Sequence, residues 1–180
     1  TVPAWNANKM PLASGLAREV REFRTELADR LEKVLPRHGR QVVSRQRPKL
    51  GEEEAGSLID WLVERFEISS TNAEAILNHC LNQLQVSLLP TGRTFLIERF
   101  VESPPHPADE SQEEGRELLH FFFHSLIGRS ANDALSRIIA HRVKEAVGGN
   151  AMVTIDDYGF LLTLRTFQDL GLEGWKELFQ

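Results

Sequence analysis

The chain has 180 residues, 41% of them apolar, which is enough to bury one sizeable core or two small ones. Its single cysteine, Cys80, excludes an internal disulfide and a cysteine-based zinc site, and it fits a reducing intracellular compartment, cytoplasmic or nuclear. The longest apolar run, residues 118–123, is far shorter than the ~20 residues of a membrane span, so we expect no membrane partner.

The formal net charge of −5 is unevenly distributed along the chain. Residues 1–50 carry 11 Lys or Arg against 5 acidic residues, whereas residues 51–180 carry 10 against 21. The basic part can neutralise the phosphates of nucleic acid, dock on an acidic surface, or act as a solvated linker. Because the acidic part would repel a duplex, a basic protein partner is favoured over DNA. The cations that crowd together are Arg37, Arg40, Arg45, Arg47 and Lys49.

The N-terminal part contains one amphipathic helix. Residues 1–11 form an irregular leader without an initiator methionine, and this leaves open whether the chain is a fragment of a longer protein. Ser14 can cap a helix over residues 15–35, whose apolar residues recur at separations of 3 or 4, close to a heptad seam. We expect this helix to cover the rest of the protein; the alternative is a homodimer through residues 16–34.

A stretch with the order helix, helix, hairpin follows over residues 52–102. Three glutamates open the first helix, where carboxylates interact well with the positive end of the helix dipole. A polar capping box then opens a second helix over residues 71–84. Two segments rich in Val, Leu, Phe and Ile, residues 85–89 and 94–100, predict a hairpin with a short turn.

The same order of elements recurs near the C-terminus. Residues 118–127 are apolar nearly all round and predict the most buried helix of the protein. A second helix begins at Ser130 and ends before a glycine pair. Residues 151–155 and 160–167 predict a second ribbon, and residues 172–179 predict a closing helix.

The apolar faces of these helices define the expected core. On the helix that begins at Ser130, the inner face comprises Ala134, Leu135, Ile138, Ile139, Val143 and Ala146. We expect Trp61, Phe122, Ile138 and Ile139 to be buried.

Because helix, polar cap, helix and ribbon occur twice, the chain resembles tandem winged-helix proteins over about residues 52–180. The resemblance implies a helix-dominated α+β fold, with two winged-helix-like repeats preceded by the N-terminal amphipathic helix. The implied parts are residues 1–51 (leader, amphipathic helix and basic loop), 52–102 (first repeat), 103–109 (Pro-rich linker) and 110–180 (second repeat with the C-terminal helix).

In a winged helix the second helix is the one that enters a major groove of DNA. In the first repeat its outer face is rich in amides, including Asn78 and Asn82. Amides can read adenine edges, but without nearby cations to anchor phosphates the affinity would be slight. The cations offered by the two repeats for contact with a partner or nucleic acid are Arg93 at the first ribbon's turn and Arg137, His141 and Lys144 on the second repeat's helix.

The sequence does not indicate catalysis. Glu117, His120 and His124 share one face of the predicted helix, but a metal site needs further ligands that the sequence does not supply. No phosphate-binding loop, dinucleotide fingerprint or Gly-x-Ser-x-Gly elbow is present. We therefore expect no catalytic residue, no cofactor, no metal and no enzymatic activity.

We interpret the chain as a non-enzymatic protein–protein interaction subunit of a larger chromosome- or nucleic-acid-associated assembly. The alternative is a DNA-binding transcriptional or replication regulator that uses residues 37–49 and the helix with Arg137, His141 and Lys144. A second alternative is an all-α adaptor domain in which the supposed ribbons are helical.

Overall fold

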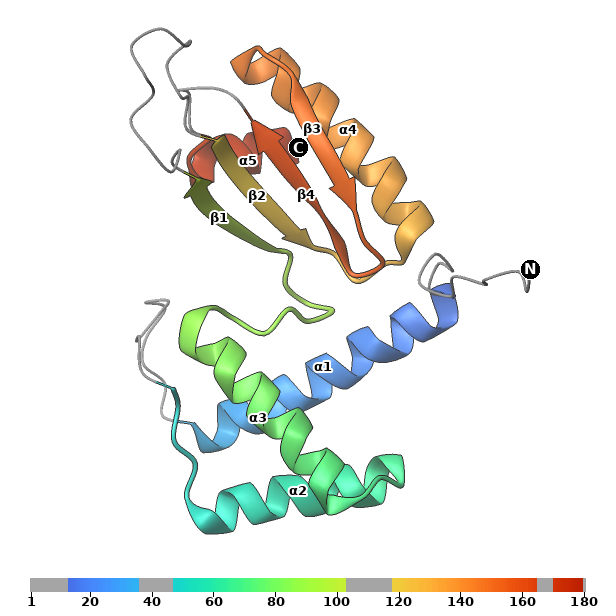
Figure 1. Cartoon of the computed structure of the whole chain (residues 1–180), viewed down its shortest axis with the longest axis vertical. Coiled ribbons are helices and arrows are strands. Elements are labelled where there is room, and N and C mark those ends of the chain that lie inside the picture. Colours follow the sequence, from blue (N-terminus) through green and yellow to red (C-terminus); the bar gives the residue numbers. More distant parts are fainter. Residues whose placement is uncertain (1–12, 36–46, 103–117, 165–169, 180) are drawn as a thin grey trace, which may run out of the picture. The chain divides into compact units, whose positions relative to one another are not determined.

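The computed structural model describes residues 13–35, 47–102, 118–164 and 170–179 (Figure 1). The chain divides into two compact units. One unit comprises Arg21–Thr94 and is helical, and the other comprises Phe95–Gln180 with Thr1–Val20 and contains a sheet.

The helical unit is built from α1 (Ser14–Val34), α2 (Glu52–Phe66) and α3 (Ser70–Val86). The predicted glutamates lie in the first turn of α2. A left-handed residue, Glu67 (φ 51°), ends α2. The Ser69 hydroxyl caps α3 by accepting a hydrogen bond from the backbone N–H of Asn72 at 3.3 Å. A short polar connection therefore folds α2 and α3 back on each other.

One apolar core joins the three helices. Leu27 and Leu31 of α1 are fully buried in it. The segment after α3 is tied to α1, because the backbone N–H of Gly92 donates to the Thr25 hydroxyl at 2.8 Å. The apolar stripe of α1 at Leu27 and Leu31 is thus used inside the unit. The other buried members are Leu58, Leu77, Cys80 and Leu81.

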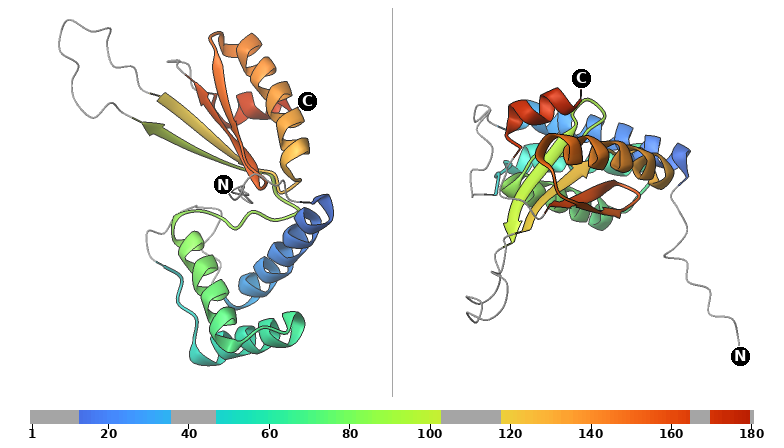
Figure 2. Two further views of the ribbon diagram at one scale, coloured as in Figure 1. Left: turned by 45° about the vertical axis from the view of Figure 1, so that its right-hand side comes forward. Right: turned by 90° about the horizontal axis from the view of Figure 1, so that it is seen from above.

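The second unit is a four-stranded antiparallel sheet with two helices on one face (Figures 1 and 2). Its strands lie in the order β1-β2-β4-β3. Side chains alternate along β2: Leu119, Phe121 and Phe123 are buried among the helices, while His120 and Phe122 point to the opposite face. The elements are β1 (Leu96–Glu102), β2 (Leu118–His124), α4 (Arg129–Val147), β3 (Ala151–Ile155), β4 (Gly159–Leu164) and α5 (Leu172–Leu178).

The helix predicted over residues 118–127 is wrong, because this segment forms β2. β2 pairs with β1 on one side and with β4 on the other, so it is a central strand. On its open face His120 is only 6% exposed and Phe122 is half-buried, so side chains on both sides of the strand are largely shielded from water. A strand with both faces covered reads as a continuous apolar run, and periodicity cannot separate such a run from a buried helix.

The two winged-helix repeats are not formed. The predicted hairpin of residues 85–89 and 94–100 is wrong, because α3 continues to Val86 and β1 pairs with β2. One sheet therefore combines a strand of the predicted first repeat with three strands of the predicted second. The predicted linker, residues 103–109, lies outside the described residues.

The α+β class and the second ribbon are confirmed, and the all-α alternative is wrong. The expected core of α4 is only partly correct: Ile139 is 2% exposed, but Ile138 is 55% exposed. Two polar residues, Asn132 and Ser136, lie fully buried on this helix. The buried face of α4 therefore includes Asn132 and Ser136, and it differs from the face that hydrophobicity alone predicts. Of the other expected core residues, Trp61 is half-buried.

Candidate nucleic-acid interface

The cations proposed from the sequence fall into three groups in the structure. Arg47 and Lys49 precede α2, and Arg93 lies on the segment that follows α3. Arg137, His141 and Lys144 lie on α4. Arg37, Arg40 and Arg45 lie outside the described residues.

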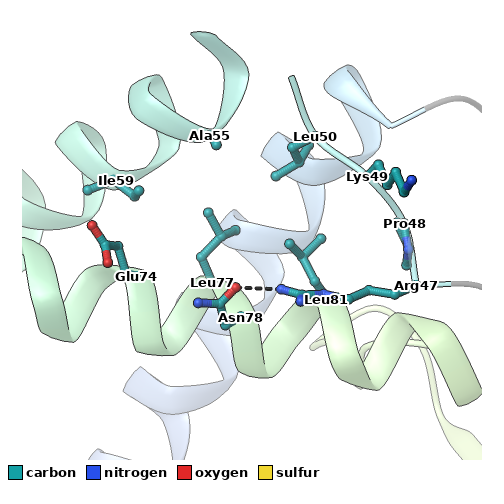
Figure 3. Close-up of a pocket in the computed structure, with 10 residues that line it drawn as sticks. All are labelled: Arg47, Pro48, Lys49, Leu50, Ala55, Ile59, Glu74, Leu77, Asn78 and Leu81. Atoms are coloured by element: carbon teal, nitrogen blue, oxygen red, sulfur yellow. Dashed lines mark hydrogen bonds between the residues drawn. The ribbon is translucent and has the colours of Figure 1, made fainter. Parts of the chain in front are cut away.

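Arg47 and Lys49 lie at a shallow pocket between α2, α3 and the segment before α2 (Figure 3). The pocket has a volume of about 480 Å³, within the range of small-ligand sites. Its apolar lining is Leu50, Ala55, Ile59, Leu77 and Leu81, and its remaining lining is Arg47, Pro48, Lys49, Glu74 and Asn78.

Helix periodicity explains how α3 contributes both kinds of side chain. Leu77 and Leu81 are buried in the core and form part of the pocket. Glu74 and Asn78 are one turn apart, and both are exposed beside these leucines. Leu50 packs against the same core and thereby fixes the basic segment next to α3. The pocket is therefore formed by residues of α2, of α3 and of the segment that Leu50 anchors to the core.

A hydrogen bond connects the basic segment to the amide-rich face of α3. The Arg47 guanidinium donates through Nη2 to Oδ1 of Asn78, 31 positions away in the sequence (Figure 3). The amide N–H groups of Asn78 remain as donors, and the Glu74 carboxylate, near Ile59 in Figure 3, is an acceptor. The structure thus supplies the cation that the outer face of α3 lacks in the sequence.

Arg93 is compensated within its own unit. Its Nη1 donates to Oδ2 of Asp29 at 3.1 Å, and its Nη2 pairs with the other carboxylate oxygen. The Arg93 guanidinium, through this hydrogen-bonded pair, lowers the pKa of Asp29 below its usual value. Arg93 is therefore already paired with a carboxylate and does not lie at the tip of a hairpin.

The cations of α4 also have acidic neighbours. Arg137 Nε lies 2.9 Å from Asp133 Oδ1, and His141 Nε2 lies 3.6 Å from Glu145 Oε1, each four residues away on the same helix. Lys144 is exposed. The outer face of α4 thus balances positive and negative charges, in contrast to Arg47 and Lys49.

His120 and His124 lie on a strand face and not on a helix. His120 Nε2 is 2.9 Å from Glu102 Oε2, and His124 Nε2 is 2.8 Å from Glu98 Oε2. Glu117 is outside the described residues. Within the described ranges, no group of three or more His, Cys, Asp and Glu side chains is placed to hold a metal ion.

Comparison with known proteins identifies the family. Residues 89–180 match the family model described as DEAD/H associated. The chain belongs to the DEAD/H associated family. Proteins of other organisms match this DEAD/H associated chain along nearly its whole length. It is 32% identical to ATP-dependent helicase Lhr-Core protein 2 of Thermococcus barophilus over 180 residues, which is 100% of the chain and 17% of that helicase.

Two further relatives carry the name ATP-dependent helicase Lhr-Core. The protein of Methanocaldococcus jannaschii is 27% identical over 179 residues, or 99% of this chain and 16% of its own length. The protein of Saccharolobus solfataricus is 28% identical over 167 residues, or 92% and 16%. The DEAD/H associated chain thus spans about one sixth of these relatives. No solved structure matches it.

These names correct the function expected from the sequence. The interpretation as a non-enzymatic interaction subunit is wrong, since the relatives are named ATP-dependent helicases. The expectation of no enzymatic activity is contradicted by the same names. The alternative, a DNA-binding transcriptional or replication regulator, agrees better with these helicase names than the main interpretation does. In the part of the chain that the structure describes, no helix is long and apolar enough to span a bilayer.

Proposed function

We propose that this chain is a part of an ATP-dependent helicase that contacts single-stranded nucleic acid, through the pocket beside Arg47 and Lys49. The observation that carries the proposal is the position of these two cations at the amide-rich face of α3. Amides and carboxylates can bind base edges, and cations anchor phosphates, so the two functions meet at one site.

The ion pairs of the cations favour the pocket surface over the surface at Arg93 and the outer face of α4. Among the described residues, neither Arg47 nor Lys49 makes an ion pair, and both are exposed. Arg93, Arg137 and His141 each lie against a carboxylate, and of the cations proposed on these two surfaces Lys144 alone makes no ion pair among the described residues. A phosphate that approaches Arg47 or Lys49 therefore breaks no ion pair among the described residues, and its binding releases counterions.

The shape of the site favours a single strand. A half-apolar pocket of about 480 Å³ can accept a group that protrudes from the backbone, whereas the bases of a duplex are stacked and paired. Binding to single strands commonly combines cations along the backbone with apolar surface for the bases. The sequence contains no phosphate-binding loop, so we propose that ATP is bound by parts of the helicase outside these residues.

The first prediction tests the two cations. Arg47→Ala with Lys49→Ala should weaken binding of the chain to a fluorescent single-stranded oligonucleotide. Removing two phosphate contacts should also reduce the slope of log affinity against log salt by about 1.4, since each contact to a single strand contributes ~0.7. Fluorescence anisotropy over a salt series measures both quantities.

The matched control is Arg137→Ala with Lys144→Ala on α4, which removes the same net charge from a different surface. We expect a smaller loss of affinity and a smaller change of slope for this control. Absence of binding by the unmodified chain, or equal effects of the two double variants, would show that the pocket is not the nucleic-acid site.

A further inference from the structure

We infer that the pocket between α2 and α3 receives one unpaired base of the strand whose phosphates lie on Arg47 and Lys49. This inference rests on the proposed function and adds the chemical group that the pocket takes. The site therefore has two parts, a basic edge for the backbone and a pocket for a base.

The pocket has the walls that a base requires. Ala55 and Ile59 of α2 line it and are partly buried against the core, and Leu77 and Leu81 of α3 form its floor, 4% and 6% exposed. Transfer of a base from water to such apolar walls is favourable and does not depend strongly on sequence, because every base has an apolar face. A phosphate or a second cation would gain nothing from these walls.

The polar groups of the pocket suit the edge of a base. Glu74 accepts hydrogen bonds, and Asn78 donates through its amide N–H groups because its oxygen accepts from Arg47. Side chains four residues apart on a helix lie about 5–6 Å apart, so a donor and an acceptor are presented side by side. Adenine and cytosine carry an amino donor next to a ring acceptor, which is the complementary pattern.

The arrangement of charge sets the direction of the strand relative to the pocket. In Figure 3 Glu74 lies at the end of the pocket beside Ile59, and Arg47 lies toward the opposite end. A carboxylate repels phosphates, so the backbone belongs at the Arg47 and Lys49 end and the base points toward Glu74. An acidic peptide would satisfy the two cations but would be repelled by Glu74, so it fits the pocket less well.

The test compares a base-containing strand with an abasic strand of the same length. Both strands carry the same phosphates, so binding to Arg47 and Lys49 contributes equally to both. Ala55→Leu fills the pocket with an apolar group and should weaken binding of the base-containing strand by about fivefold or more, which is the lower end of the effect of one stacked base. The affinity for the abasic strand should not change.

Ser57→Leu is the matched control, because Ser57 is exposed on α2 and does not line the pocket. It should bind both strands as the unmodified chain does. Thermal unfolding of the Ala55→Leu variant checks that it is folded. Equal affinity of the unmodified chain for the two strands, or equal weakening of both by Ala55→Leu, would overturn the base pocket while leaving phosphate binding intact. If the variant with Arg47→Ala and Lys49→Ala binds both strands as tightly as the unmodified chain does, the proposed function is contradicted instead.

Discussion

At the scale of single residues, polar side chains decide where the elements of the sheet unit meet. Asn132 is fully buried, and its amide Nδ2 donates to the carbonyl oxygens of Asp156 at 2.9 Å and Asp157 at 3.2 Å. Its Oδ1 accepts from the Ser125 hydroxyl. One side chain thus joins the start of α4 to the turn between β3 and β4 and to the segment after β2.

Asn132→Ala should lower the free energy of unfolding by about 1–3 kcal/mol, because it removes the hydrogen bonds of a fully buried amide. Denaturant unfolding followed by circular dichroism measures this change. Asn82→Ala is the control, since Asn82 is an exposed amide on α3 and its loss should change stability by no more than about 0.5 kcal/mol. A similar small effect for both variants would show that Asn132 does not hold the turn.

Glu74 should set the base preference of the pocket. A strand with one cytosine in an otherwise abasic backbone should bind more tightly than the same strand with thymine, because the amino group of cytosine donates to the carboxylate. Glu74→Gln should reduce this preference, since the amide can also donate to the thymine carbonyl. The ratio of the two affinities, measured by anisotropy, is the quantity to compare.

Glu64→Gln provides the control for charge. Glu64 is exposed on α2 and is not part of the pocket lining, so its replacement alters the net charge equally and should leave the ratio unchanged. If Glu64→Gln and Glu74→Gln shifted the ratio alike, the preference would not come from contact with the base.

At the scale of elements, the pair of Asp29 and Arg93 fixes the segment after α3 to α1. The folded state holds the pKa of Asp29 below its unfolded value, so the pair stabilises the fold above the unfolded pKa of about 3.9. This contribution is lost as the pH falls through the lowered folded pKa. The melting temperature of the unmodified chain should therefore exceed that of Arg93→Gln at pH 6, and the difference should shrink as the pH falls below about 4.

Asp60→Asn on α2 is a suitable comparison, because it removes a carboxylate and leaves the pair of Asp29 and Arg93 in place. Its difference in melting temperature from the unmodified chain should not follow the same pH dependence. A difference between the unmodified chain and Arg93→Gln that was constant from pH 6 to pH 3 would show that the pair does not contribute to stability.

The sequence predicted those elements whose signals are local. Three glutamates and a serine cap mark α2 and α3, and a short polar turn marks the ribbon of β3 and β4. The prediction for the segment of β2 was wrong because its apolar run has no period that distinguishes a strand from a helix. The predicted pairing of β1 was wrong, since its partner strand lies beyond residues 103–117. No local pattern in the sequence identifies a partner across that distance.

The candidate site shows the same limit. The sequence shows Arg47 and Lys49 as cations and Asn78 as part of an amide-rich helix face, but it does not connect the basic segment with that face. Only the contact between Arg47 and Asn78 brings them together. No local signal in the sequence distinguishes an apolar residue that lines a pocket, such as Ala55 or Ile59, from one in a core.

At the scale of the whole molecule, the family assignment and the structure complement each other. The DEAD/H associated model covers residues 89–180, which contain the described sheet unit, whereas the proposed base pocket lies in the unit of Arg21–Thr94. The relatives align with both parts. Net charge is a poor guide to a chain of this kind, because an overall charge of −5 conceals a small basic site.

The hydrogen bond between Arg47 and Asn78 also affects how fast a strand can bind. A guanidinium has five N–H donors, and the bond to Asn78 leaves others available for a phosphate. The side chain is therefore held in place before the ligand arrives, so little conformational entropy remains to be lost on association. If a strand binds at the proposed site, we therefore expect Arg47 to need little rearrangement on encounter.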